Sequence, residues 1–228
     1  MRLSILLATA ALLVMALMAP AGQEVSPQAG ADEQISLPQP KRDGEISLEA
    51  AIAARRSVRE FADTPLTWEQ VGQLAWAAQG ITEPTRGLRA APSAGGLYPL
   101  EVYFVTPDGF YHYLPDGHKL QRRSSADLRG ALQTATGSPT SIAQAPVDVV
   151  LTAVFERTAT RFGERAEQYV YMEVGHAAQN LQLQAVALGL GSVPIGGLDA
   201  ARVTEALALP QDHRPLYIIP VGHPLSPP

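Results

Sequence analysis

The chain of 228 residues contains no cysteine, so neither a disulfide framework nor a thiolate-ligated metal can stabilise its fold. Charged residues are also scarce, at 17%, and the formal net charge is only −5, which argues against the basic face of a general nucleic-acid-binding protein. The hydrophobic fraction of 46% is typical of globular proteins rather than disordered ones. Together with the length, these limits predict one sizeable folded domain.

Several motifs that carry common chemistries are missing as well. Neither GxGxxG nor GxxxxGK[ST] occurs, so no Rossmann or P-loop nucleotide site is indicated, and GxSxG, the nucleophile elbow of hydrolases, is absent. The five histidines show no HExxH spacing, and we therefore predict no metal site. One of them, His176, falls inside a long helical pattern, where a core or interface role is the plainer interpretation.

Residues 1–21 have the pattern of a secretory signal peptide. Arg2 precedes an apolar run over residues 3–18, and Ala19-Pro20-Ala21 supplies the small residues that signal peptidase needs. The alternative is a membrane anchor, but the run is shorter than the roughly 20 apolar residues of a spanning helix. We therefore expect an exported protein, periplasmic or extracellular, that keeps no stable membrane span after cleavage. Residues 22–45, rich in proline and polar side chains, predict a flexible leader, with the folded domain over 46–228.

Hydrophobic periodicity and capping residues divide this domain into irregularly interleaved helices and strands. Ser47, Thr67 and Asp199 are expected to cap helices, and Gly80 to end one. Helices are predicted over 47–56, 67–79, 126–134, 164–188 and 199–208, and strands over 102–106, 110–114, 119–122, 147–155 and 216–221. A turn at 115–117 joins two of the strands, and residues 82–96 are expected to form a loop. This order predicts an α+β fold rather than a doubly wound parallel sheet.

Three segments could carry chemistry. Segment 55–61 (RRSVREF) gathers three guanidiniums, which suit a phosphate or carboxylate through bidentate hydrogen bonds. Its alternative is the last turn of a helix with solvated side chains. Segments 91–99 (APSAGGLYP) and 189–199 (GLGSVPIGGLD) are rich in glycine, which lets the backbone approach a flat ligand closely, although each could also be a simple connection.

In their order and spacing these segments resemble the nitroreductase superfamily of FMN-dependent oxidoreductases, over about residues 47–224. The form YPLEV at 98–102 is most similar to the SagB-type dehydrogenases of that superfamily. The resemblance implies a central mixed or antiparallel sheet flanked by helices and a homodimer with FMN at its interface. It also implies a small-molecule or peptide substrate, bound on the exposed flavin face.

The same resemblance implies a role for each segment. The first segment would hold the phosphate and ribityl chain through Arg55, Arg56 and Ser57, with Arg59 near the pyrimidine edge of the flavin. The second would be offered to the flavin of the neighbouring subunit through Pro92, Ser93, Ala94 and Gly95. In the third, the backbone of Gly196 and Gly197 would face flavin N5.

The resemblance further implies hydride transfer at flavin N5, with Tyr98 and His176 as the candidates for an acid or base. Many relatives bind the FMN phosphate through basic residues after the final Val-Gly segment, which this chain lacks. Because nicotinamide cofactors are scarce outside the cytoplasm, an exported enzyme is expected to act as a dehydrogenase with another electron partner. The alternative is a flavin- or ligand-binding module of the same fold without redox turnover.

Overall fold

The computed structural model describes residues 33–137 and 140–226, and the predicted signal peptide lies outside this range. Its main feature is a seven-stranded sheet in the order β1-β6-β5-β4-β7-β9-β8, in which every pairing is antiparallel. The strands are β1 (Gln34–Ser36), β4 (Leu100–Thr106), β5 (Gly109–Leu114), β6 (Lys119–Ser124), β7 (Val147–Ala153), β8 (Gly191–Ser192) and β9 (Arg214–Gly222). A separate hairpin joins β2 (Ile81–Glu83) to β3 (Leu88–Arg89).

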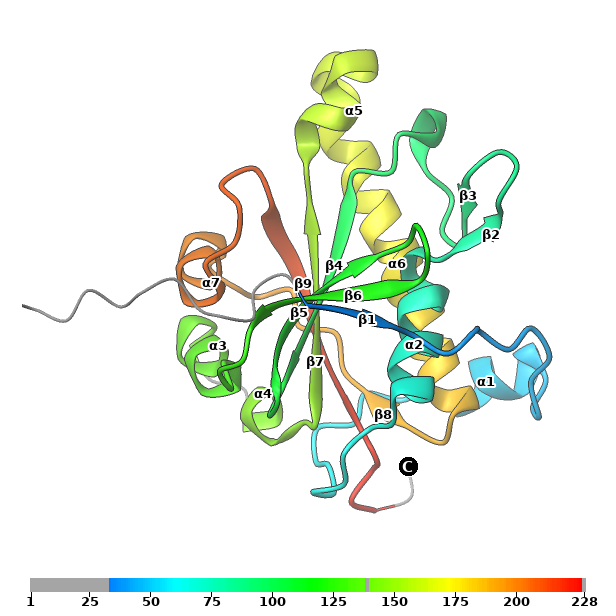
Figure 1. The fold of residues 1–228 in the computed structure, drawn as a ribbon, viewed down its shortest axis with the longest axis vertical. Helices are drawn as coiled ribbons and strands as arrows, with labels where there is room; N and C mark the ends of the chain where they lie inside the picture. Colours follow the sequence, from blue (N-terminus) through cyan, green and yellow to red (C-terminus); the bar gives the residue numbers. More distant parts are fainter. Residues whose placement is uncertain (1–32, 138–139, 227–228) are drawn as a thin grey trace, which may run out of the picture.

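Helices cover both faces of the sheet, which confirms the predicted α+β class (Figure 1). One core packs the sheet against α2 (Trp68–Gln79) and α6 (Ala166–Ala187). The other packs it against α3 (Arg129–Ala135), α4 (Thr140–Gln144) and α7 (Ala200–Leu207). The central strand β7 is buried at all seven positions, because alternate side chains enter opposite cores. This explains why its sequence is a continuous apolar run.

Three helix starts follow the predicted capping chemistry. Ser47 accepts a hydrogen bond from the Ala50 N–H at 3.1 Å at the start of α1 (Leu48–Ala54), and Thr67 forms a capping box with Gln70. Asp199 accepts from two backbone N–H groups of α7. Side-chain oxygens thus satisfy amides that lack partners within each helix.

The predicted domain start at Ile46 is wrong. Strand β1 pairs with β6, and the following residue, Leu37, is only 4% exposed. His118 fixes this segment further, because its backbone oxygen accepts from the Leu37 N–H and its Nε2 lies 3.0 Å from the Pro38 oxygen. A segment too polar to form a core of its own is ordered here by the backbone groups of an existing edge strand.

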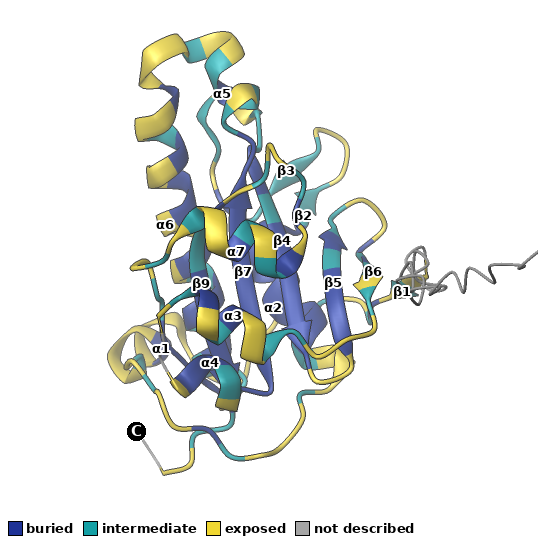
Figure 2. Ribbon diagram, turned by 90° about the vertical axis from the view of Figure 1, so that its left-hand side faces the viewer, coloured by how far each residue is buried: buried dark blue, intermediate teal, exposed yellow. Residues whose placement is uncertain are grey.

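Local periodicity also misplaced some elements. The loop predicted at 82–96 contains the β2–β3 hairpin, and the strand predicted to reach Phe155 ends at Ala153, where α5 (Phe155–Phe162) follows. Helix α1 buries Ala51 but leaves Leu48 and Ile52 61% and 55% exposed. Figure 2 shows that the outer side of α6 is exposed as well. Within the described residues, no helix is long and apolar enough to cross a membrane.

Candidate functional site

The first and third predicted segments lie side by side. The Val58 N–H donates to the Ser192 oxygen at 3.0 Å, and Ser57 forms a parallel bridge with the same residue. Gly191 makes this approach possible, because a Cβ at its position would lie 2.6 Å from the Val58 Cβ. A further bond, from the Ala62 N–H to the His223 oxygen at 2.8 Å, ties the end of segment 55–61 to the end of β9.

The three arginines of segment 55–61 divide into two kinds. Arg56 folds back on α1, where its Nη1 donates to the oxygens of Ala53 at 2.9 Å and of Arg55 at 2.8 Å. It therefore serves the end of the helix, which was the alternative interpretation of the cluster. Arg55 and Arg59 form no ion pair within residues 33–137 and 140–226, so their charge remains for an external anion.

The glycine pair of the third segment presents backbone at the surface. Ile195 is hydrogen-bonded in both directions to Ile218 of β9, which fixes the chain just before the pair. Gly196 lies against the Tyr217 ring, where a Cβ would be 2.8 Å from a ring carbon. Gly197 is exposed, and no atom of the described part of the chain lies within 4 Å of a Cβ there. The pair therefore leaves room for a ligand to reach the main chain.

The second segment is held as a rigid loop around Tyr98. The Tyr98 N–H donates to the Ser93 Oγ at 2.8 Å, and the Tyr98 backbone has a φ of 47°, which is rare for a non-glycine residue. Its hydroxyl oxygen accepts from the Arg89 N–H at 3.1 Å, and the Arg89 guanidinium lies 4.6 Å above its ring. This tyrosine was a candidate acid or base, and its contacts are those of a residue that shapes the loop.

An ion-pair network also stabilises the loop of the second segment. The Arg157 guanidinium of α5 donates to the backbone oxygen of Tyr98 at 3.1 Å and pairs with Glu101 at 2.5 Å. The other Glu101 oxygen lies 2.7 Å from His112 Nε2. Burial raises the pKa of Glu101, but the hydrogen bonds and charges of His112 and Arg157 outweigh it and hold the pKa below its usual value. Glu101 therefore remains ionised at neutral pH.

The register of the sheet separates the second segment from the first and from residues 191–192 of the third. The Gly196–Gly197 pair lies between the two ends, because Gly196 packs on Tyr217, which pairs with Leu151 of β7. Val147, at the start of β7, pairs with Val221, next to the Gly222–Gly191 pair, while Ala153 at its end pairs with Leu100, just after the second segment. Seven strand residues span about 20 Å. In Figure 1, α1 and β8 accordingly lie at the opposite end of the sheet from α5 and the β2–β3 hairpin.

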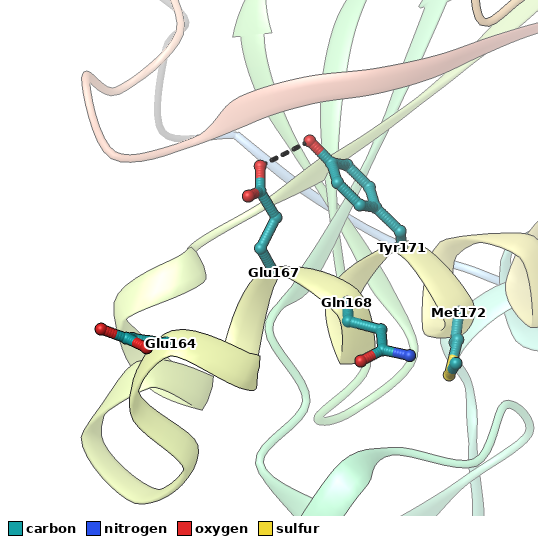
Figure 3. A pocket seen from close by; sticks show the side chains of 5 residues that line it. All are labelled: Glu164, Glu167, Gln168, Tyr171 and Met172. Atoms are coloured by element: carbon teal, nitrogen blue, oxygen red, sulfur yellow. Dashed lines mark hydrogen bonds between the residues drawn. The ribbon is translucent and has the colours of Figure 1, made fainter.

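The other candidate acid or base, His176, is not brought to these segments by any hydrogen bond or ion pair of the described residues. It is exposed on α6. An open hollow of about 570 Å³ lies on the exposed face of the same helix, lined by Glu164, Glu167, Gln168, Tyr171 and Met172, and Figure 3 shows the Glu167–Tyr171 hydrogen bond of 2.8 Å within it. It contains none of the predicted flavin-binding residues.

Sequence reasoning missed one buried ionisable group. Glu173 of α6 is 3% exposed, and burial raises its pKa to about 7, against the opposing effects of the Ser93 hydroxyl and the Arg89 charge. A glutamate within an otherwise apolar helix face was the available signal.

Comparison with known proteins agrees with this architecture. The model of the nitroreductase family matches residues 52–223. A provisionally named nitroreductase of Methanocaldococcus jannaschii is 38% identical over 188 residues, covering 80% of this chain and 93% of its own. A provisionally named nitroreductase structure from Ralstonia eutropha has a TM-score of 0.79 and 32% identity, covering 87% of this chain and 93% of its own. The NADPH:FMN oxidoreductase of Vibrio harveyi has a TM-score of 0.60 and 27% identity, covering 79% of this chain and 70% of its own.

The chain therefore belongs to the nitroreductase family. It is an FMN-dependent oxidoreductase. Its own residues fit this cofactor, because Arg55 and Arg59, which have no acidic partner among the described residues, can neutralise a phosphate, and an exposed glycine leaves space beside the backbone.

Proposed function

We propose that FMN binds between two copies of this chain, with segments 55–61 and 191–197 from one copy and segment 92–95 from the other. The observation that carries this proposal is the separation of about 20 Å along β7 between the first segment and the second. Within one copy this distance keeps the second segment away from a ligand bound to Arg55 and Ser57. A two-fold pair of chains can bring the two ends together, because each copy supplies both halves.

Exposed apolar side chains offer a surface for this pairing. Leu48 and Ile52 of α1 are more than half exposed, and Tyr171 and Met172 of α6 are 43% and 50% exposed. Large apolar groups left in water on two helices that contact each other are typical of an interface.

Each segment then has a physical task. Arg55 and Ser57 would bind the phosphate and ribityl chain, and Arg59 would set positive charge beside the pyrimidine edge, where reduction adds negative charge. The backbone of Gly196 and Gly197 would donate hydrogen bonds near N5. When bound, FMN supplies the hydride chemistry, and the protein binds and orients it.

We further propose an exported, SagB-type dehydrogenase as the biological role. The YPLEV form of the second segment supports the type, and the pattern of residues 1–21 supports export. The Vibrio harveyi relative is named for its use of NADPH. For an enzyme outside the cytoplasm we expect a small-molecule or peptide substrate to reduce the cofactor faster than NADPH does.

Subunit mixing tests the shared site. One variant combines Arg55→Ala with Arg59→Ala, and the other carries Gly95→Val, where φ is 65° and a Cβ would lie 2.8 Å from Arg161. Each variant alone is expected to lose FMN binding. In an equal mixture about half of the dimers contain one copy of each variant, and each of these has one intact site of its two. Fluorescence titration should therefore recover about a quarter of the wild-type sites. A mixture that recovers no binding means that each site lies within one chain.

Mass spectrometry and absorbance of the protein from its natural compartment test the proposed cleavage of residues 1–21 and the presence of flavin. We expect an N-terminus at Gly22 and a flavin absorption spectrum. A chain that retains residues 1–21 contradicts cleavage. Protein that binds FMN but whose reduced cofactor passes electrons to no acceptor favours the alternative of a binding module.

A further inference from the structure

Arg161, near the end of α5, lies directly against the second flavin segment. A Cβ built at Gly95 would be 2.8 Å from the Arg161 Nη1 and 3.3 Å from its Cζ, so the guanidinium covers the open side of this glycine. Gly95 has a φ of 65°, in the left-handed region that favours glycine. A side chain at this position would take the space of the guanidinium. The glycine therefore allows a cation to lie beside the loop.

Arg161 differs from the preceding arginine of the same helix, because it has no ion pair. Arg157, one helical turn earlier, pairs with Glu101 and donates to the backbone oxygen of Tyr98. Arg161 is exposed, and it forms no ion pair within residues 33–137 and 140–226. Arg157 therefore stabilises the loop, whereas the charge of Arg161 remains for an external anion.

Aromatic rings gather Arg161 and a second arginine into one cluster. The Arg161 Cζ lies 5.4 Å from the centroid of the Phe162 ring, and the Arg165 Cζ lies 5.9 Å from that of Tyr169. The two rings contact each other edge to face, with centroids 5.0 Å apart. Arg165 also has no ion pair among the described residues. Two guanidiniums without carboxylate partners create a positive potential beside the second segment.

We propose that Arg161 is a specificity-determining residue that binds a carboxylate or another anionic group of the substrate. This inference rests on the proposed function, in which segment 92–95 faces the flavin of the neighbouring copy. A substrate stacked on that flavin lies beside Gly95 and therefore within reach of the Arg161 guanidinium. The FMN phosphate is assigned to Arg55 and Ser57 of the other copy, and the ribityl chain separates it from the ring. Arg161 is thus left to bind the substrate.

Titration of the FMN-loaded protein with two matched probes tests the inference. Para-nitrobenzoate and para-nitrobenzamide are similar in size and shape, but only the first is anionic. Binding of each is followed by the change in the absorption spectrum of oxidised FMN, so no turnover is needed. Because a charge-assisted hydrogen bond strengthens binding by about 10- to 100-fold, wild type should prefer nitrobenzoate by at least about 10-fold. Arg161→Gln should lose this preference through weaker binding of nitrobenzoate, and Arg161→Lys should keep part of it.

Arg202→Gln is the matched control. Arg202 is an exposed arginine of α7, a helix that packs against α3 and β9. The substitution removes the same charge and should leave both affinities unchanged. Equal weakening of both probes in Arg161→Gln would mean that the residue only supports the loop. That result, an unchanged preference in Arg161→Gln, or no preference in wild type would each overturn this inference while FMN still binds. Absence of FMN binding to wild type would overturn the proposed function as well.

Mixed dimers locate Arg161 relative to the shared site. When a chain with Arg55→Ala and Arg59→Ala pairs with a Gly95→Val chain, the intact site takes segment 92–95 from the first of them. Adding Arg161→Gln to that chain should abolish the preference for nitrobenzoate at the intact site. Adding it to the Gly95→Val chain should leave the preference in place. Equal effects in the two arrangements would contradict a contact between Arg161 and the substrate.

Discussion

Gly191→Ala tests whether contact between the first and third segments holds the flavin site together. The added Cβ would lie 2.6 Å from the Val58 Cβ and 2.7 Å from both Val58 methyl groups. Rotating the valine cannot relieve a clash with its own Cβ, so the two backbones must separate. Overpacking costs about 1–3 kcal/mol, and loss of the Val58–Ser192 hydrogen bond adds about 1 kcal/mol. We therefore expect unfolding in urea to show a loss of roughly 2–4 kcal/mol.

Gly191→Ala should also weaken FMN binding, because its Cβ displaces Val58, which lies in the same segment as Arg55 and Arg59. Gly197→Ala is the matched control, since no described residue lies within 4 Å of a Cβ at that position. Its stability should change by less than about 1 kcal/mol. Wild-type stability and FMN affinity in Gly191→Ala would refute the reasoning.

Double mutants make the test more specific. Val58→Ala removes the methyl groups but keeps the Cβ that clashes, so it should not rescue Gly191→Ala. Val58→Gly removes that atom and should recover part of the lost stability, which a double-mutant cycle would report as a favourable coupling energy. Equal rescue by both variants would show that the Cβ–Cβ contact is not the cause.

Three further changes follow from buried or capped groups. Glu101→Gln should lower the free energy of unfolding by roughly 2 kcal/mol at pH 7. Because the folded pKa of Glu101 is depressed, this contribution is present above about pH 4.5 and is lost as the pH falls through the folded pKa. Unfolding curves at pH 3 and pH 7 would show the difference. Asp148 is fully buried, burial raises its pKa well above the usual value, and neither carboxyl oxygen has a partner in the described structure, so it destabilises the fold increasingly as the pH rises above about 3.8. Asp148→Asn should therefore raise the melting temperature at pH 8 more than at pH 4, and an equal shift at both would contradict this. Thr67→Ala should cost about 1 kcal/mol in urea unfolding through loss of the capping box, whereas Thr85→Ala on an exposed turn should cost less.

Much of the secondary structure was predictable, because its causes are local. Ser47, Thr67 and Asp199 cap helices through bonds to amides two or three residues away, and such bonds need no distant partner. The buried strand β7 was predictable from its unbroken apolar run. Strand β1 was not, because its three residues are ordered by β6, more than 80 residues further along the chain.

The candidate site likewise combines features that the sequence determines with features that only the tertiary structure decides. The residue types in segments 55–61, 91–99 and 189–199, and their order, are properties of the sequence and sufficed for the resemblance to the nitroreductase family. That Arg56 turns back to α1 while Arg55 and Arg59 do not depends on the path of the chain after the helix. The raised pKa of Glu173 depends on its burial by the rest of the fold, which no local pattern encodes.

The sequence alone thus determined the family, the cofactor class, the capped helices and the central strand, since these follow from residue identity and short-range periodicity. Only the tertiary structure decided which segments meet. Antiparallel pairing of β9 with both β7 and β8 brings residues 191–192 of the third segment to the first segment at one end of the sheet. The pairing of β4 with β7 carries the second segment to the other end, because register fixes position along a strand.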